Sequence, residues 1–326
     1  MIVCCGEAVI DMMQTAVPGL GEVFLPLPGG CSYNTSITIG RLGVPVAFLG
    51  RLSTNFFGEI QVKRLRENHV RDDLVIRCDQ NPVLSFIRIE KGKEPQYAFY
   101  DEGTADRALL TEDLPPLPPE TACIVFGSIS MNMEPIASTI ETLILREAQR
   151  KKVIAFDPNI RPFMIKDRDA YMKRFEQWIS VCTIAKISAE DFEYIFPGTE
   201  PEEALRKIIG LGTRLAIATL GPNGAIAMLR RNEGNVTRIY APAASVSEIA
   251  DTVGAGDTFH GAFLAWLEMR GKMSPGSIAC LSETDLYDAL VFANKAAAIV
   301  CTRHGAEPPT LEEIAKVKNP EVSAKL

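Results

Sequence analysis

Several features that would assign the chain to a familiar class are missing from its 326 residues. No basic run stands out and the net charge is −7, which argues against nucleic acid and anionic membranes as partners. No stretch of 18 apolar residues is free of charge, so we expect no membrane span. The N-terminus lacks the basic region of a signal peptide, and the eight cysteines include no Cys-x-x-Cys pair. We therefore expect free thiols in a cytoplasmic protein.

The sequence also lacks the signatures of three large enzyme classes. Without Gly-x-x-x-x-Gly-Lys-Ser/Thr the chain is not a P-loop nucleotidase. Cys5-Gly6-Glu7-Ala8 stands where a nicotinamide-dependent dehydrogenase carries Gly-x-Gly-x-x-Gly after its first strand. The absence of Gly-x-Ser-x-Gly counts against an α/β-hydrolase, and the three histidines show no metal-binding spacing.

Apolar, strand-like runs alternate with helix-like segments along most of the chain. Such alternation favours a parallel sheet covered by helices on both faces. No internal repeat or long linker interrupts it, so we expect one α/β domain over residues 1–326. The expected strands are Ile2–Cys5, Val46–Gly50, Ile124–Phe126, Val153–Phe156, Thr183–Ile187 and Leu215–Thr219, and the expected helices are Asn34–Leu42, Gly58–His69, Ile136–Arg150, Asp169–Val181 and Pro201–Leu211.

Two stretches depart from this alternation. Residues 12–30 are rich in proline and glycine, and residues 83–100 alternate apolar and polar positions around a Lys91-Gly92-Lys93-Glu94 turn. We predict a small β-sheet formed by about 12–30 and 83–105. It would either act as a lid over the strand ends, where α/β sheets bind ligands, or be a peripheral hairpin without a role.

The segment from Asp251 to Phe259 carries the clearest chemical signal. A Gly254-Ala255-Gly256 turn precedes apolar residues at helical spacing, so a helix begins at the turn. The unpaired N–H groups of a helix N-terminus suit a phosphate or an oxyanion. Asp257 would then lie beside the anion, where its natural task is to accept a proton from an attacking hydroxyl.

Other polar motifs follow expected strands or precede expected helices. Taken alone, each is as well explained by a turn, a helix cap or a solvated helix end. Together they converge on one edge of the predicted sheet. They are Asp11 at the expected end of the first strand, Gly29–Asn34 before a helix, Asp157–Arg161, Lys186–Asp191, and the glycine-rich Thr219–Gly224.

The segment Asp251–Phe259 resembles the C-terminal signature of the ribokinase-like, or PfkB, carbohydrate kinases. Further motifs follow in the family's order, and the resemblance extends from Gly6 to about Pro308. It implies a ribokinase-like three-layer α/β fold, with a mostly parallel central sheet flanked by helices and a small β-sheet lid. The other motifs are Gly29-Gly30 with Asn34, Gly50 with Gly58, Thr219–Gly224, and Asn294–Ala298 ahead of Arg303–Ala306; Gly6–Asp11, Phe99–Ala105 and Asp157–Arg161 look most like bacterial fructokinases.

The resemblance implies roles for individual residues in the transfer. Asp257 would be the general base, and the N–H groups of Gly254, Ala255 and Gly256 would form the anion hole. The remaining residues would meet the sugar: Asp11, Gly29, Gly30 and Asn34 would hold it, Tyr97 and Phe99 would cover it from the lid, and Arg161 would contact the sugar or the phosphates.

The resemblance also implies a nucleotide site and two kinds of metal site. ATP would be lined by Lys186, Ser188, Thr219, Gly221 and Gly224, with Asn294 near the adenine. Ser188 and Asp191, with Glu190 between them, match a motif that organises Mg²⁺ and phosphate. Asp251, Val253, Val300, Arg303 and Gly305 match a K⁺ loop that acts largely through backbone carbonyls.

The chain departs from the family's pattern at a few of these positions. Ser53 and Asn55 stand where the family often has Gly and Asp, and Asp191 is one methylene shorter than the usual Glu. Ser188 replaces an Asn, and Pro309 offers the K⁺ loop no hydroxyl. None of these departures touches Asp257.

The resulting expectation is an ATP-dependent sugar kinase that transfers the γ-phosphoryl group to a sugar hydroxyl, with fructose to fructose 6-phosphate as the first interpretation. A 2-keto-3-deoxygluconate kinase stays open, with Arg88 or Arg107 adding a guanidinium beside Arg161, as does a ribokinase or nucleoside kinase. A non-catalytic sugar- or nucleotide-sensing protein is an alternative of another class, and a dehydrogenase is a third. The resemblance also leaves a homodimer through the lid open.

Overall fold

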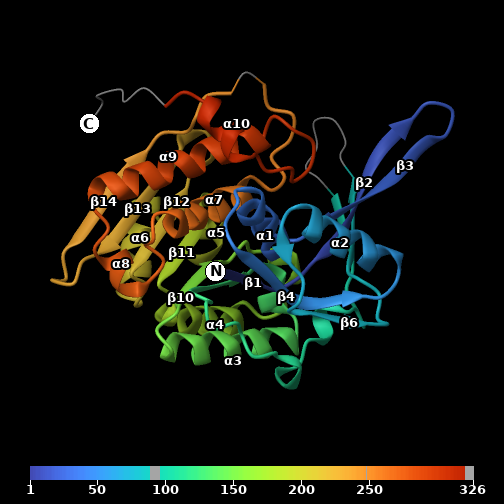
Figure 1. Ribbon diagram of the computed structural model, residues 1–326, viewed down its shortest axis with the longest axis horizontal. Coiled ribbons are helices and arrows are strands. Elements are labelled where there is room, and N and C mark those ends of the chain that lie inside the picture. The colour runs from blue at the N-terminus through green and yellow to red at the C-terminus, as the bar shows by residue number, and fades with distance from the viewer. Residues whose placement is uncertain (89–95, 247, 320–326) are drawn as a thin grey trace.

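The computed structural model describes residues 1–88, 96–246 and 248–319, which form two β-sheets and the helices around the larger one (Figure 1). The larger sheet has ten strands in the order β14-β13-β12-β11-β10-β9-β1-β4-β5, with β6 also paired to β4. All neighbours are parallel except β12–β13 and β13–β14. The strands are β1 (Ile2–Cys5), β4 (Val46–Ser53), β5 (Val70–Arg71), β6 (Val75–Cys78), β9 (Cys123–Gly127), β10 (Val153–Asp157), β11 (Ile184–Ser188), β12 (Leu215–Thr219), β13 (Ala225–Arg230) and β14 (Val236–Ala241).

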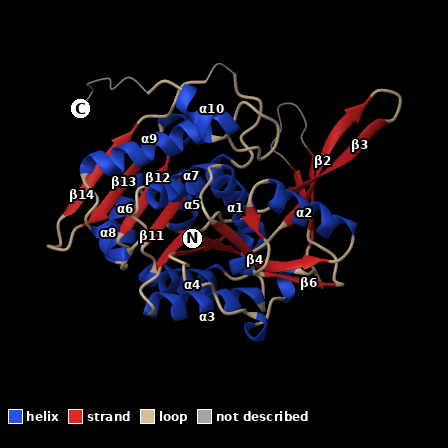
Figure 2. Cartoon of the chain, viewed as in Figure 1, coloured by secondary structure: helices blue, strands red, loops and turns tan. Residues whose placement is uncertain are grey.

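Helices cover both faces of this sheet, so the main body has three layers (Figure 2). Successive strand residues enter opposite cores because side chains alternate across a strand. Ile2 and Cys4 belong to one apolar cluster, whereas Val3 and Cys5 belong to the other. The first cluster packs on α1 (Cys31–Arg41), α2 (Phe56–Glu67), α7 (Ala255–Met269), α8 (Pro275–Ala279), α9 (Glu283–Val300) and α10 (Leu311–Lys316), and the second on α3 (Ile136–Gln149), α4 (Arg168–Val181), α5 (Ala189–Ile195) and α6 (Pro201–Gly210).

The smaller sheet has four strands in the order β3-β2-β7-β8, and its β2–β3 hairpin extends away from the main body (Figure 1). Only β2 and β7 are parallel. The expected Lys91–Glu94 turn lies outside the described residues. The four strands are β2 (Val9–Val17), β3 (Gly21–Gly29), β7 (Leu84–Arg88) and β8 (Gln96–Tyr100).

The observed architecture confirms the predicted mostly parallel sheet flanked by helices, with a second small sheet. The position expected for Asp11 is wrong. Asp11 does not end the first strand, because the chain leaves β1 at Gly6, which has a φ of +151°. Asp11 instead lies on β2, opposite Ser85 of β7. The antiparallel strands β13 and β14 were not anticipated. In the part of the chain that the structure describes, no helix has the length and apolar character needed to cross a membrane.

Helices α1 and α7 pack closely, and this packing places their N-termini side by side. Gly261 of α7 lies against α1, where a Cβ atom would come within 2.8 Å of the Thr38 Cβ and 2.9 Å of the Thr35 carbonyl oxygen. A larger residue would force the two helices apart.

We predict that Gly261→Ala lowers the free energy of unfolding by about 1–3 kcal/mol, because the added methyl overpacks this helix crossing. Chemical denaturation measures the change. Gly276→Ala is the matched control, since it also adds a methyl to a helix but meets nothing within 4 Å. Equal stabilities for the two variants would contradict the close packing of α1 on α7.

Candidate functional site

The turn before α7 is shaped by two glycines. Gly254 caps the helix with a φ of +74°, and a Cβ there would come within 2.5 Å of the Ala306 side chain. A Cβ on Gly256 would lie 3.1 Å from the Lys186 ammonium nitrogen. Ala255, between them, donates its N–H to the Thr252 carbonyl at 3.2 Å. The turn thus presents a helix N-terminus, whose first N–H groups lack helical partners, directly beside a buried cation.

Asp257, in the first turn of α7, is held by two asparagine amides. Asn34 of α1 donates to its Oδ2 at 2.9 Å, and Asn159 donates to its Oδ1 at 3.4 Å. Asn159 has a φ of +38°, a left-handed conformation that is uncommon outside glycine. The two amides hold the carboxylate in one orientation from opposite sides.

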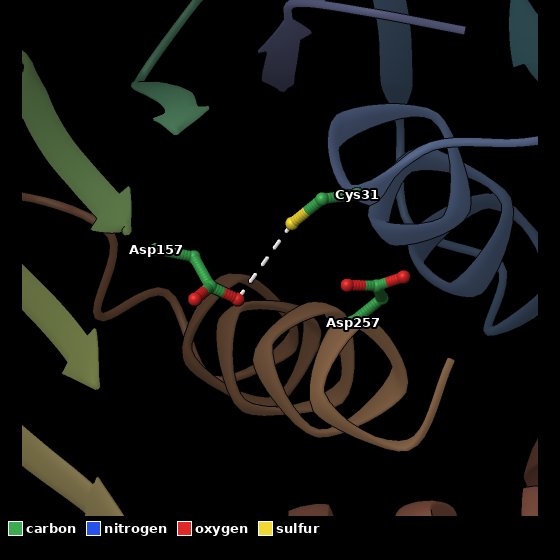
Figure 3. Close-up of side chains that lie close together, drawn as sticks. All are labelled: Cys31, Asp157 and Asp257. Atoms are coloured by element: carbon green, nitrogen blue, oxygen red, sulfur yellow. Dashed lines mark hydrogen bonds between the residues drawn. The ribbon is translucent and has the colours of Figure 1, made fainter. Parts of the chain in front are cut away.

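Asp157 lies at the end of β10, near Cys31 and Asp257 (Figure 3). It also forms a buried ion pair. The Lys186 Nζ of the neighbouring strand β11 is 2.9 Å from the Asp157 Oδ2, and both side chains are buried. The Cys31 Sγ, at the start of α1, is 3.8 Å from the same oxygen. The two carboxylates and the thiol converge within 4.8 Å of one another.

Burial controls the protonation of this cluster. Burial and the charge of Asp157 raise the pKa of Asp257, although the Asn34 amide and Lys186 act in the opposite direction. Burial would lower the pKa of Lys186, but the carboxylates of Asp157 and Asp191 outweigh it and raise that pKa. Lys186 therefore stays charged. Burial and Lys186 lower the pKa of His260 to about 3, so this ring stays neutral.

The cluster holds more acceptors than donors. Among the described residues, Asn34 Oδ1, Asn159 Oδ1 and Asp157 Oδ1 are buried side-chain oxygens without a hydrogen-bond partner. Buried polar atoms are normally satisfied, so such a group of open acceptors suits a ligand that brings several hydroxyl donors.

The small sheet brings Asp11 to the same place. A Cβ on Gly29, which is paired with Val9 on the neighbouring strand, would come within 2.2 Å of the Asp11 Oδ2, so glycine leaves room for this carboxylate. Burial raises the pKa of Asp11 to about 6, with the Ser85 hydroxyl and Arg161 lowering it and Asp257 raising it. The charges of Asp257 and Arg161 thus both act on the Asp11 carboxyl, which places Asp11 of the lid sheet near these two residues of the main body.

Two aromatic residues of β8, Tyr97 and Phe99, are predicted to cover the sugar. Phe99 lies opposite Ser85 in the β7–β8 register, on the same sheet face as Asp11. Its ring lies 5.5 Å from that of Phe163. Tyr97 lies on β8, but its side chain is outside the described part of the structure. Gly30, with a φ of +107°, ends the passage from β3 to α1.

The predicted magnesium residues lie at the start of α5 and differ in availability. Asp191 accepts the Ile160 N–H at 2.7 Å and the Ser188 N–H at 3.3 Å, so both of its oxygens are engaged. Ser188 caps the helix through the Asp191 N–H at 3.0 Å. Glu190 is exposed. An outer-sphere contact through water suits Asp191, and Glu190 is open to solvent.

The predicted nucleotide residues lie farther along the same sheet edge. Thr219 ends β12, and Gly221 and Gly224 form the turn into β13, where a Cβ on Gly224 would meet the Ala241 carbonyl oxygen at 2.2 Å. Asn294 of α9 is buried and donates to the carbonyls of Ala241 and Pro242. Its amide thus anchors the end of β14.

Asp251 joins the two loops predicted to bind K⁺. Its carboxylate accepts the N–H of Val253 and that of Gly305, each at 3.0 Å. Arg303 donates to the carbonyls of Glu307 and Pro308 and pairs with Glu313. Val300 is the last residue of α9, just ahead of this loop.

Four residues of the cluster around Asp257, here called the central cluster, had no role assigned from the sequence. Asp157 and Asn159 lie in the Asp157–Arg161 motif, from which only Arg161 had been given a role. Cys31 follows the Gly29-Gly30 pair, and His260 lies one turn after Asp257. The sequence signal that could have identified all four is that each lies in or next to a recognised motif.

Known proteins resemble this chain throughout its length. Residues 1–313 match the family described as pfkB family carbohydrate kinase. A fructokinase of Rhizobium leguminosarum bv. trifolii is 36% identical over 287 residues, which cover 88% of this chain and 85% of the relative. Fructokinase-1 of Oryza sativa subsp. japonica is 30% identical over 325 residues, covering 97% of each chain.

Solved structures show the same architecture. A fructokinase with bound ATP from Xylella fastidiosa superposes with a TM-score of 0.84 at 23% identity, covering 96% of each chain. An uncharacterised sugar kinase from Pyrococcus horikoshii in complex with ATP superposes with a TM-score of 0.78 at 26% identity, covering 94% of each chain. With the family match over nearly the whole sequence, this chain belongs to the pfkB family of carbohydrate kinases and is a phosphotransferase.

Proposed function

We propose that this protein is an ATP-dependent fructokinase that transfers the γ-phosphoryl group of ATP to fructose and forms fructose 6-phosphate. The observation that carries the proposal is the buried Asp257 carboxylate, clamped by Asn34 and Asn159 beside the N-terminus of α7. The 36% identical Rhizobium relative is a fructokinase, which supports the choice of sugar.

In this mechanism Asp257 accepts the proton of the sugar hydroxyl as that oxygen attacks the γ-phosphorus. The N-terminus of α7 and the Lys186 ammonium stabilise the negative charge that develops on the transferring group. Gly256 allows this approach, since its missing side chain leaves the space beside Lys186 open. Fixed dipoles in a buried site do this without reorganising at the moment of transfer.

Mg²⁺ would neutralise phosphate charge in this reaction. The chain offers hard oxygen ligands at the start of α5, which fit that ion. Glu190 is open to bind it, and Asp191, already engaged with two N–H groups, would act through water. The loop organised by Asp251 would hold K⁺ through backbone carbonyls, and Thr219, Gly221 and Gly224 would line the nucleotide.

Two observations favour a neutral sugar over 2-keto-3-deoxygluconate. The open acceptors on Asn34, Asn159 and Asp157 need hydroxyl donors, whereas a carboxylate would add further acceptors. In addition, the two arginines considered as a second guanidinium for a carboxylate are placed elsewhere in the described residues. Arg107 pairs with Asp101 and the Glu134 carbonyl, and Arg88 lies on the lid face opposite to Asp11.

A coupled ADP-release assay with Mg·ATP tests the proposal across fructose, 2-keto-3-deoxygluconate, ribose, glucose, adenosine and tagatose 6-phosphate. We expect the highest kcat/KM for fructose. A preference for 2-keto-3-deoxygluconate would keep the chemistry and reassign Arg161 to a carboxylate. No transfer to any acceptor, with ATP still bound, would replace the kinase with a sensing protein.

We predict that Asp257→Asn lowers kcat by ~10²–10⁴-fold, because the amide keeps the shape of the side chain but cannot accept the proton. The KM values for sugar and ATP should change little. Steady-state kinetics of the purified variant measures the loss. Asp288→Asn, an exposed carboxylate on α9, is the control that should keep normal turnover. Near-normal kcat in Asp257→Asn would exclude the general-base role.

We predict that kcat/KM falls on the acid side of its pH profile and that Asn34→Ala moves this fall to higher pH. Asp257 must be ionised to act as a base, and burial and Asp157 raise its pKa. The Asn34 amide lowers that pKa, so its removal lets the carboxylate protonate at a higher pH. Asn232→Ala, in an exposed turn, is the control. An acid limb that stays in place, or moves to lower pH, would contradict the amide's effect on Asp257.

A further inference from the structure

The chain crosses between the main body and the lid sheet four times in the described residues. The crossings are residues 6–8 between β1 and β2, residue 30 between β3 and α1, residues 79–83 between β6 and β7, and residues 101–105 after β8. Two buried carboxylates, those of Glu7 and Asp106, lie among these crossings, and neither belongs to the phosphoryl-transfer site.

Asp106 joins three of the crossings. Its Oδ1 accepts the N–H of Ala8 at 2.8 Å, and its Oδ2 accepts the N–H of Val83 at 3.3 Å. Ala8 is in the first crossing and Val83 in the third, while Asp106 itself directly follows the fourth. Ala8 is also held from the other side, because the Gln61 amide of α2 donates to its carbonyl at 2.6 Å.

Glu7 joins the remaining crossing to the main body. Its Oε1 accepts the N–H of Cys31 at 3.0 Å, at the point where the chain enters α1 from the lid. Its Oε2 accepts the hydroxyl of Ser130, which follows β9 in the main body. The Glu7 N–H in turn donates to the Ser130 oxygen at 2.8 Å.

These carboxylates occupy an unfavourable environment. Burial, together with the neighbouring charge of Glu7, raises the pKa of Asp106 to about 7, although the N–H groups of Ala8 and Val83 act in the opposite direction. Burial likewise raises the pKa of Glu7. A side chain that costs solvation energy here must supply something that a neutral residue would not. What Asp106 supplies is two acceptor oxygens in one plane, facing N–H groups from two separate crossings.

We propose that Asp106 and Glu7 are positioning residues that fix the lid sheet relative to the main body, and thereby set the place of Asp11 and Phe99. Asp11 lies on β2, which begins after the first crossing, and Phe99 lies on β8, which ends at the fourth; the two share one face of the lid sheet. The kinetic part of this inference depends on the proposed sugar kinase activity, whereas the structural part does not.

The test is Asp106→Asn in the full-length chain. The amide oxygen still accepts one N–H group, but the amide nitrogen then faces the other, so one crossing loses its bond. The substitution also removes a buried charge, so we expect the variant to fold. Glu147→Gln is the matched control, because Glu147 is also a buried carboxylate but lies on α3, bonded to Arg146 and Arg150.

Two readouts separate positioning from a general structural role. Hydrogen exchange followed by mass spectrometry should be faster in Asp106→Asn for the peptides that contain Ala8 and Val83, and unchanged on α3. The KM for the sugar should rise about ten- to a hundredfold, the range that corresponds to one unsatisfied buried donor, while the KM for ATP stays the same.

If the peptides that contain Ala8 and Val83 exchange hydrogen in Asp106→Asn at the rates of the wild-type protein, the inference is overturned whatever the activity of the enzyme. Faster hydrogen exchange throughout the molecule, with an equal rise in the KM for sugar and the KM for ATP, would also overturn the inference, since Asp106 would then serve only stability. If no sugar in the panel is phosphorylated, the proposed function fails, but the exchange result still decides the structural part.

Discussion

The buried ion pair between Asp157 and Lys186 is the interaction on which the phosphoryl-transfer end of the molecule depends. Asp157 ends β10 and Lys186 lies in the middle of the neighbouring parallel strand β11, so the sheet itself brings the two side chains to 2.9 Å. Removing one member of a buried pair leaves the other charge uncompensated, at a cost of about 3–5 kcal/mol. Without Lys186, Asp157 would oppose the ionisation of Asp257 still more strongly. The ion pair with Lys186 therefore allows Asp157 to lie beside Asp257, the proposed base, while Asp257 is ionised.

Much of the architecture could be predicted from the sequence because its signals are local. Leu215–Thr219 is an apolar run that ends in a threonine ahead of a glycine-rich turn, and it forms β12 with those bounds. The helix after the glycine turn begins at Ala255, where the spacing of Phe259, Phe263 and Trp266 places it. Strands β13 and β14 were not predicted, because the sequence of Thr219–Gly224 is equally typical of a ligand loop and of a hairpin turn. In the structure this segment joins the antiparallel strands β12 and β13.

The central cluster could be predicted only in part, because its contacts depend on tertiary structure. Asp257 stood out through its own helix turn. Asn159 gave no comparable signal, since its contact with Asp257 spans 98 positions and depends on where β10 ends relative to α7. Asp11 was assigned to the wrong element, because the exit of the chain at Gly6 into the small sheet follows from pairing with β7, not from residues nearby.

Helix α1 connects the lid to the base through a single turn of helix. The N–H of Cys31 at its start is bonded by Glu7, and the amide of Asn34 is bonded to Asp257. Its second turn, at Thr35 and Thr38, packs against Gly261 of α7, so α1 cannot shift without moving the helix that carries the proposed base. A displacement at the lid crossings would therefore reach the orientation of the Asp257 carboxylate directly. On the proposed role of Glu7 and Asp106, these buried carboxylates hold the lid and the proposed base in one frame. Transfer to a sugar hydroxyl requires that alignment, which offsets the solvation energy that the two carboxylates lose on burial.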